Sequence, residues 1–205
     1  MKNDVKKYEL KQILAILITF SLALLPWAAP AAELEGIKLP DSVRISDGGA
    51  ELALNGAGLR TRFMFRVYVG ALYVQKKTTV ASAVISDAGA KRVALHMLRD
   101  VPADQFADAL EDGLKNNNPA EALAKLDAQV KQLRAVFDAV KVAKSGDMIL
   151  IDYLPDSVPG SGTRVTINAA VKTTIPGEDF NRALLRIWLG DKPADNDLKK
   201  GMLGG

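Results

Sequence analysis

The sequence contains no cysteine and a single histidine, His96. The first absence excludes disulfides and thiol chemistry, so the fold must be held together by its own core. The second excludes every metal site that needs two imidazoles, and a Ser-His-Asp triad could be built only with His96. No EF-hand spacing occurs, which leaves an all-carboxylate site as the one open arrangement. We therefore predict neither a metal site nor a cofactor.

The chain also has no complete dinucleotide-binding loop. The stretch GAGLRT, beginning at Gly56, starts like such a loop, but Thr61 stands where the third glycine is needed. It is also followed by an alternating strand pattern, whereas a dinucleotide-binding loop must be followed by a helix. A nucleotide cofactor is therefore not expected.

The first 31 residues have the three-part layout of a secretory signal peptide. Four lysines lie within residues 2–11, a mostly apolar run without charges covers residues 13–25, and Ala29 and Ala31 supply small residues for cleavage. A transmembrane anchor is the alternative, but the run is shorter than the roughly 20 residues that a spanning helix needs. We predict a cleaved signal peptide over residues 1–31, a periplasmic or secreted location, and no membrane span after cleavage.

The remaining residues, 32–205, are enough for a single domain. The signal segment carries four lysines against Asp4 and Glu9, so its removal lowers the formal charge from +3 to +1. The high isoelectric point therefore belongs largely to the targeting segment. No basic surface for nucleic acid is expected.

Hydrophobic periodicity divides the mature chain into strands and helices. Alternating apolar positions indicate strands over residues 55–74, 91–98, 147–155 and 162–176. Apolar residues recurring at threes and fours indicate helices over residues 80–86, 100–115, 123–140, 180–189 and 198–202. Asp100 is the predicted N-cap of the second helix. This order of elements predicts an α+β domain.

Three arginines interrupt the strand predicted over residues 55–74. Arg62 and Arg66 fit a solvated strand face, on which arginine stems lie over apolar neighbours and the charges pair with carboxylates. Arg60 differs because it follows NGAG, where glycines allow a tight turn and a close approach to another group. It also shares the even-numbered face with Tyr68. A guanidinium held there can bind a carboxylate or an enolate through paired donors.

Other residues that could carry chemistry have structural interpretations as well. His96 alternates with Leu95 and Met97 and is expected to be a structural histidine rather than an acid, base or ligand. Trp188 is expected first in the core and second as a cavity-lining residue. Arg99 could join an ion pair that orients Arg60, or it could face a cavity.

Several ordered blocks of the sequence resemble the chalcone isomerase-like family. They are LNGAGLRTRFMFRVYVGALYV, the LRD that ends a strand before a helix, and the closing IPGEDFNRALLRIWLGDKPADNDLKKGMLG. The resemblance covers residues 37–204 and is strongest to the bacterial exported branch. It implies an open-faced β-sandwich, in which helices pack on one side of a large antiparallel sheet and enclose an apolar ligand cleft.

The resemblance also implies which residues surround that cleft. The family's arginine falls on Arg60, but the strand threonine of the plant enzymes falls on Tyr68 and their active-site tyrosine falls on Phe106. Their asparagine and C-terminal threonine fall on Gly113 and Ile187. Most groups that order the catalytic water and polarise the ketone are therefore missing. An arginine and a tyrosine that hold a carboxylate are instead typical of the family's fatty-acid-binding branch.

The leading hypothesis is a periplasmic, non-catalytic protein that binds a small apolar carboxylate such as a fatty acid. Its predicted ligand-binding residues are Arg60, Tyr68, Arg99, Phe106 and Trp188. One alternative is an isomerase or intramolecular lyase acting on an unsaturated carbonyl, with Arg60 as its electrostatic element. A second is an envelope interaction protein with a vestigial cleft. The leading hypothesis predicts an enclosed cavity with Arg60 at its polar end, and the last predicts a cavity filled by side chains.

Overall fold

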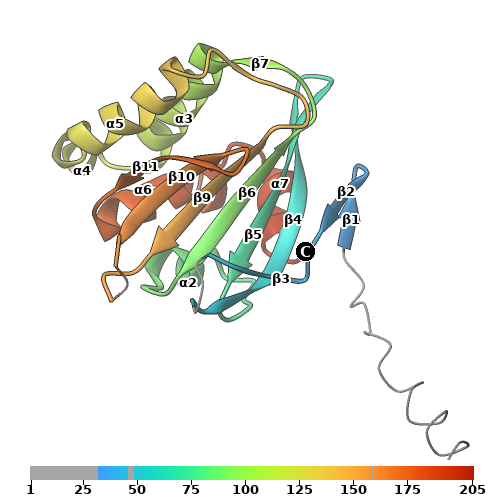
Figure 1. The fold of residues 1–205 in the computed structure, drawn as a ribbon, viewed down its shortest axis with the longest axis horizontal. Helices are drawn as coiled ribbons and strands as arrows, with labels where there is room; N and C mark the ends of the chain where they lie inside the picture. The colour runs from blue at the N-terminus through green and yellow to red at the C-terminus, as the bar shows by residue number, and fades with distance from the viewer. Residues whose placement is uncertain (1–31, 46–48, 158) are drawn as a thin grey trace, which may run out of the picture. The chain divides into compact units, whose positions relative to one another are not determined.

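A large antiparallel sheet forms the centre of the molecule (Figure 1). The computed structural model describes residues 32–45, 49–157 and 159–205, so the predicted signal peptide lies outside the described residues. In that part of the chain seven strands pair in the order β11-β10-β9-β6-β5-β4-β3. Their bounds are β3 (Ser42–Arg44), β4 (Glu51–Arg62), β5 (Phe65–Val74), β6 (Lys91–Met97), β9 (Met148–Leu154), β10 (Gly162–Ile167) and β11 (Ala170–Ile175).

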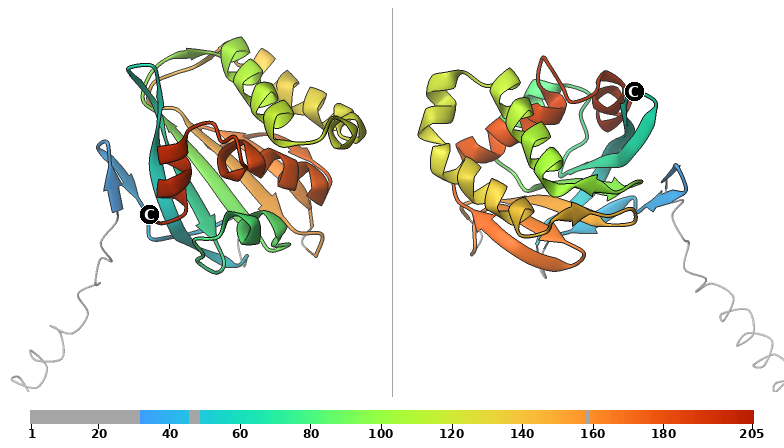
Figure 2. Two further views of the ribbon diagram at one scale, coloured as in Figure 1. Left: turned by 180° about the vertical axis from the view of Figure 1, so that it is seen from behind. Right: turned by 90° about the horizontal axis from the view of Figure 1, so that it is seen from above.

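The main core lies between this sheet and the helices on one of its faces (Figure 2). The helices are α2 (Ala81–Ser86), α3 (Ala103–Asn117), α4 (Ala120–Lys125), α5 (Asp127–Asp138), α6 (Glu178–Leu189) and α7 (Asn196–Met202). Leu72 and Leu95 from the sheet pack in one cluster with Leu114, Phe180 and Trp188 from the helices. Burying each such side chain contributes about 1.5–3 kcal/mol to folding. The expected α+β architecture, with helices on one side of a large antiparallel sheet, is confirmed.

The opposite face of the sheet carries a second, smaller apolar cluster. Val69 and Tyr73 of β5 lie there beside Leu39, which belongs to a hairpin of β1 (Ala32–Leu34) and β2 (Ile37–Leu39). A separate two-stranded ladder joins β7 (Val101–Pro102) to β8 (Val142–Ala143), directly before α3 and after α5. This ladder ties the start of α3 to the segment that follows α5.

The segment predicted as one strand over residues 55–74 is a β-hairpin. β4 ends at Arg62, the chain turns at Phe63 and Met64, and β5 returns from Phe65. Phe63 adopts a positive φ of 56°, the left-handed conformation that such turns use. The prediction of a single strand was wrong because none of the usual turn residues marks the reversal.

A β-bulge in the hairpin sets which side chains share a face. Arg60 pairs with Tyr68 and Arg62 pairs with Phe65, so Val67 is left without a partner between them. Residues directly opposite each other point to the same side of a sheet. Arg60 and Tyr68 therefore lie on one face, as predicted, through cross-strand pairing rather than alternation along one strand.

Gly56 and Gly58 allow α7 to lie directly on β4, and they do not form the tight turn that the sequence suggested. A Cβ built on Gly56 would lie 2.2 Å from the carbonyl oxygen of Gly201, and one on Gly58 would lie 2.8 Å from Cα of Leu198. Asn55 adds a hydrogen bond from its Nδ2 to the carbonyl oxygen of Met202 at 2.8 Å. The close approach predicted for this stretch is present, but its partner is the C-terminal helix.

Two helix predictions need correction. The long helix expected over residues 123–140 is divided at Leu126 into α4 and α5. Asp100 does not cap the preceding helix, since α3 begins at Ala103 and has no side-chain cap. Oδ1 of Asp100 instead accepts a hydrogen bond from the backbone N–H of Ser145 at 2.8 Å, because the β7–β8 ladder brings that loop next to it.

Candidate functional site

A cleft of about 490 Å³ lies between the end of the β4–β5 hairpin, the segment that follows β6, and α3. Its wall includes the apolar side chains of Val67, Phe106, Leu110 and Ile187. Several residues at its edge are exposed, so it is open to solvent and is not the fully enclosed cavity that was expected. A volume of this size lies within the range of about 300–1,000 Å³ typical of small-molecule sites.

Arg60 lines the cleft and is held by the segment between α6 and α7, whose Ala194 also lines it. Its Nη1 donates a hydrogen bond to the carbonyl oxygen of Ala194 at 2.7 Å. The next residue, Thr61, donates its backbone N–H to Oδ2 of Asp195 at 3.0 Å. The guanidinium lies 5.9 Å from the centre of the Tyr68 ring. One donor thus fixes the guanidinium, and it has further N–H groups to offer a ligand.

Tyr68 is buried and also lines the cleft. Its hydroxyl oxygen accepts a hydrogen bond from Nε1 of Trp188 at 3.0 Å. An indole N–H can only donate, so the hydroxyl proton of Tyr68 is left to be donated elsewhere. Burial raises the pKa of this hydroxyl above its usual value, with the charge of Arg60 acting in the opposite direction. The group is therefore a protonated donor at neutral pH.

Trp188 is not among the residues that line the cleft. Its side chain is 1% exposed and packs in the main core from α6. The core placement expected first for Trp188 is the observed one, whereas its predicted role as a ligand-binding residue needs correction because its ring is buried away from the cleft. Its relation to the site is indirect, because it occupies one lone pair of the Tyr68 oxygen and so orients that hydroxyl.

Arg99 and Arg62 stand at the exposed edge of the cleft, and both line it. The guanidinium of Arg99 lies 4.3 Å from the ring centre of Phe65, so Arg99 faces the cleft edge rather than Arg60. Arg66 points away from the cleft and forms an ion pair with Glu35. The expectation of a solvated, carboxylate-paired side chain holds for Arg66, whereas Arg62 is exposed but belongs to the cleft.

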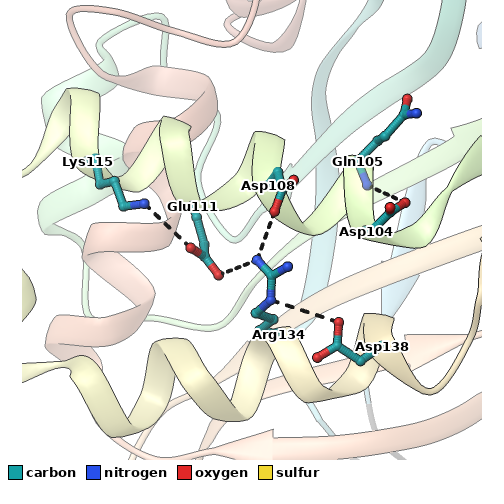
Figure 3. Close-up of polar contacts among 7 residues, drawn as sticks. All are labelled: Asp104, Gln105, Asp108, Glu111, Lys115, Arg134 and Asp138. Atoms are coloured by element: carbon teal, nitrogen blue, oxygen red, sulfur yellow. Dashed lines mark hydrogen bonds and ion pairs between the residues drawn. The ribbon is translucent and has the colours of Figure 1, made fainter.

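The α3 wall of the cleft carries acidic side chains, which the sequence analysis missed. Asp108 and Asp112 of α3 line the cleft together with Asp100. Nη1 of Arg134 on α5 lies 2.9 Å from Oδ1 of Asp108 and 2.8 Å from Oε1 of Glu111 (Figure 3). The i,i+4 spacing of the two aspartates beside the apolar face of α3 was the available signal. The pair with Arg134 compensates part of the negative charge on this wall.

The positions that carry hydrogen-bonding groups in the plant enzymes hold apolar residues here. Phe106 and Ile187 line the cleft, and Gly113 lies behind them on α3. A Cβ on Gly113 would lie 2.8 Å from Cγ2 of Ile187, so glycine at this position leaves room for the isoleucine. These residues supply apolar surface and no proton carrier.

His96 lies outside the cleft. Its neighbours Leu95 and Met97 face the helices, and alternation places His96 on the other face of β6. Burial lowers the pKa of its imidazole. Within the described residues no group of three His, Asp or Glu side chains is placed to hold a metal ion.

A curled antiparallel sheet, covered by helices on one face and hollowed by a cleft with an arginine and a tyrosine, defines an α+β protein with a ligand-sized site. The chalcone isomerase-like family model matches residues 31–204. The chain therefore belongs to the chalcone isomerase-like family.

Comparison with solved structures supports the same fold. A fatty-acid binding protein of Arabidopsis thaliana, AtFAP1, superposes with a TM-score of 0.62 at 15% sequence identity, covering 84% of this chain and 95% of that one. The search of curated proteins found no match. None of the described helices has the length and apolar character needed to cross a bilayer.

Proposed function

We propose that the protein binds a fatty acid, or another small apolar carboxylate, in the cleft and does so without catalysing a reaction. The observation that carries this proposal is that two donors, Arg60 and Tyr68, line the same cleft as a group of apolar side chains. Arg60 is held by Ala194 and Tyr68 by Trp188, and each keeps a donor group that an anion in the cleft can use. Hydrogen bonds to a carboxylate are strong when a charged donor takes part.

The remaining wall suits an aliphatic chain. Phe106, Leu110 and Ile187 supply apolar surface, and each methylene removed from water contributes about 0.8 kcal/mol. The name of the Arabidopsis neighbour states that it binds fatty acid, which supports the same ligand class on this fold. The open volume also favours a binding role over the alternative of a vestigial cleft.

We also propose that the protein works after export, in the periplasm or outside the cell. The family match begins at residue 31, and the first described strand, β1, begins at Ala32. The segment before it has the composition of a signal peptide. These boundaries agree with the cleavage predicted next to residue 31.

Titration calorimetry of Arg60→Ala tests the ligand proposal. We expect the affinity for a long-chain fatty acid to fall about 10- to 150-fold, because a hydrogen bond to a charged group contributes about 1.5–3 kcal/mol. The matching fatty alcohol carries no charge and should bind nearly unchanged. Arg66→Ala is the control variant, since Arg66 pairs with Glu35 and points away from the cleft.

Two results would contradict the proposal. Equal losses for acid and alcohol would make Arg60 a structural clamp for the segment around Ala194. An Arg60-dependent acceleration of chalcone cyclisation, followed by absorbance, would instead favour the isomerase alternative.

A further inference from the structure

The tip of the β4–β5 hairpin exposes three consecutive large apolar side chains, and we call Phe63, Met64 and Phe65 the hairpin tip. Their side chains are 89%, 90% and 56% exposed. A lone exposed apolar residue is common on protein surfaces, whereas a contiguous group at a projecting turn indicates a contact site. Figure 1 shows this hairpin reaching beyond the neighbouring strands at the end of the sheet where β7 lies.

Three arginines lie next to the hairpin tip. Arg62 and Arg66 flank it in sequence, and Arg99 lies against the Phe65 ring. Arg66 is paired with Glu35, but among the described residues neither Arg62 nor Arg99 forms an ion pair. Two arginine charges next to exposed aromatic rings are complementary to a lipid bilayer with anionic headgroups at its surface and apolar acyl chains below them.

We propose that the hairpin tip inserts into the interface of an anionic lipid bilayer. Its three side chains would enter the boundary between headgroups and acyl chains, while Arg62 and Arg99 meet lipid phosphates. A protein partner is disfavoured by shape, because a narrow projecting turn offers much less than the roughly 800 Å² per partner of a standard interface. Aromatic rings beside cations are also the residues found at membrane surfaces.

The hairpin tip lies next to the cleft, so docking of the tip would also bring the cleft to the membrane. Phe63 and Phe65 of the hairpin tip line the cleft together with Arg62, so the end of the cleft that these residues form would face the bilayer. An apolar carboxylate could then pass between membrane and cleft with little exposure to water. This last step rests on the proposed ligand class, whereas the docking itself does not.

A fluorescent label at residue 64 tests the docking in the full-length chain. The chain has no cysteine, so Met64→Cys creates a single site for an environment-sensitive fluorophore. The control is Val171→Cys on β11, an exposed apolar position at the opposite edge of the sheet. With vesicles of phosphatidylcholine and phosphatidylglycerol, we expect the label at 64 to brighten and shift to the blue, and the label at 171 to change little.

Local insertion is distinguished from other causes by the pair of labels. Any attachment through the N-terminal apolar segment acts on both labelled proteins, so equal responses at 64 and 171 would overturn the proposal. No response at 64 would overturn it as well. A response at 64 that appears without vesicles and grows with protein concentration would identify a second copy of the chain as the occupant, again against the proposal.

A substitution outside the cleft separates docking from ligand binding. Met64 is not a lining residue, so Met64→Glu should leave fatty-acid affinity in vesicle-free solution unchanged. We expect the same change to lower partition into the anionic vesicles at least about tenfold, because an apolar contact is replaced by a repelled charge. Val171→Glu should leave partition unchanged. If the wild-type chain inserts into vesicles but does not bind fatty acid, the proposed function is refuted and the docking proposal stands.

Discussion

At the residue scale, the direction of one hydrogen bond determines what Tyr68 can do. Because the Trp188 indole donates to the Tyr68 oxygen, the hydroxyl keeps its own proton for another acceptor. The two residues are 120 positions apart in the chain. The donor that Tyr68 offers to the cleft therefore depends on a side chain that does not line the cleft.

The variant Tyr68→Phe should lower both ligand affinity and stability. Losing a donor to a carboxylate should weaken fatty-acid binding by about 1.5–3 kcal/mol. The buried Trp188 N–H, left without a partner, should cost a further 1–3 kcal/mol, roughly, in unfolding free energy. Titration and urea denaturation measure the two effects. Adding Trp188→Phe removes the unpaired N–H, so it should recover part of the unfolding free energy that this group cost. It should recover none of the affinity, and a recovery of affinity would contradict the role of Tyr68.

His96 should make the unfolding free energy depend on pH near neutrality. It is the one side chain of this sequence whose unperturbed pKa lies between pH 5 and 8. Its pKa is lowered by burial, so below about pH 6.5 the unfolded chain takes up a proton that the folded chain still refuses. The unfolding free energy should therefore decrease as the pH falls through the unfolded pKa towards the folded one. Urea denaturation at pH 7.5 and 5.5 should show a smaller change for His96→Gln, and identical changes would contradict the assignment.

At the element scale, the hairpin shows where sequence reasoning succeeds and where it stops. Alternation and the family resemblance placed Arg60 and Phe106 at a cleft on the correct fold. The reversal at Phe63 was not predictable from turn residues, since neither Phe63 nor Met64 is a typical one. The bulge at Val67 leaves no mark in an apolar run. Contacts between distant segments, such as Arg60 with Ala194, have no local signature at all.

The ion pairs between α3 and α5 should tune the charge of the cleft. Arg134 compensates Asp108, which lines the cleft, and Glu111, and these partners raise the pKa of its guanidinium. Arg134→Met would leave both carboxylates uncompensated. We expect fatty-acid affinity at low salt to fall by a factor of about two to five, the range of partly exposed ion pairs.

Two controls belong to the Arg134 prediction. Lys131→Met on the same helix removes an ion pair with Asp127, neither of which lines the cleft, and should leave affinity unchanged. Raising the ionic strength should reduce the effect of Arg134→Met, because salt screens exposed charges. An effect that persists at 1 M salt would indicate a displacement of α3 instead.

At the scale of the whole molecule, residues 32–205 contain the sheet, both apolar clusters and the cleft. The residues that line the cleft all lie between Arg60 and Ala194 in the sequence. A chain that lost its first 31 residues would therefore keep the cleft and carry a formal charge of +1. The proposed processing and the proposed ligand site are compatible.

The mature protein should begin near Ala32. N-terminal sequencing of the protein extracted from the cell envelope measures this directly, and the small residues at Ala29 and Ala31 are the reason for the expected position. An intact Met1 would mean that the N-terminal segment is retained, and it would overturn the proposed soluble periplasmic form.

The packing of α7 on β4 bears on the order in which parts of this domain fold. Asn55 and Met202, which are joined by a hydrogen bond, are separated by 147 positions, and the glycines of β4 are shaped to receive the C-terminal helix. Contacts across such a separation carry a large loop-closure cost and form late. The contact between β4 and α7 is therefore expected to be among the late events of folding, after α7 itself has been synthesised.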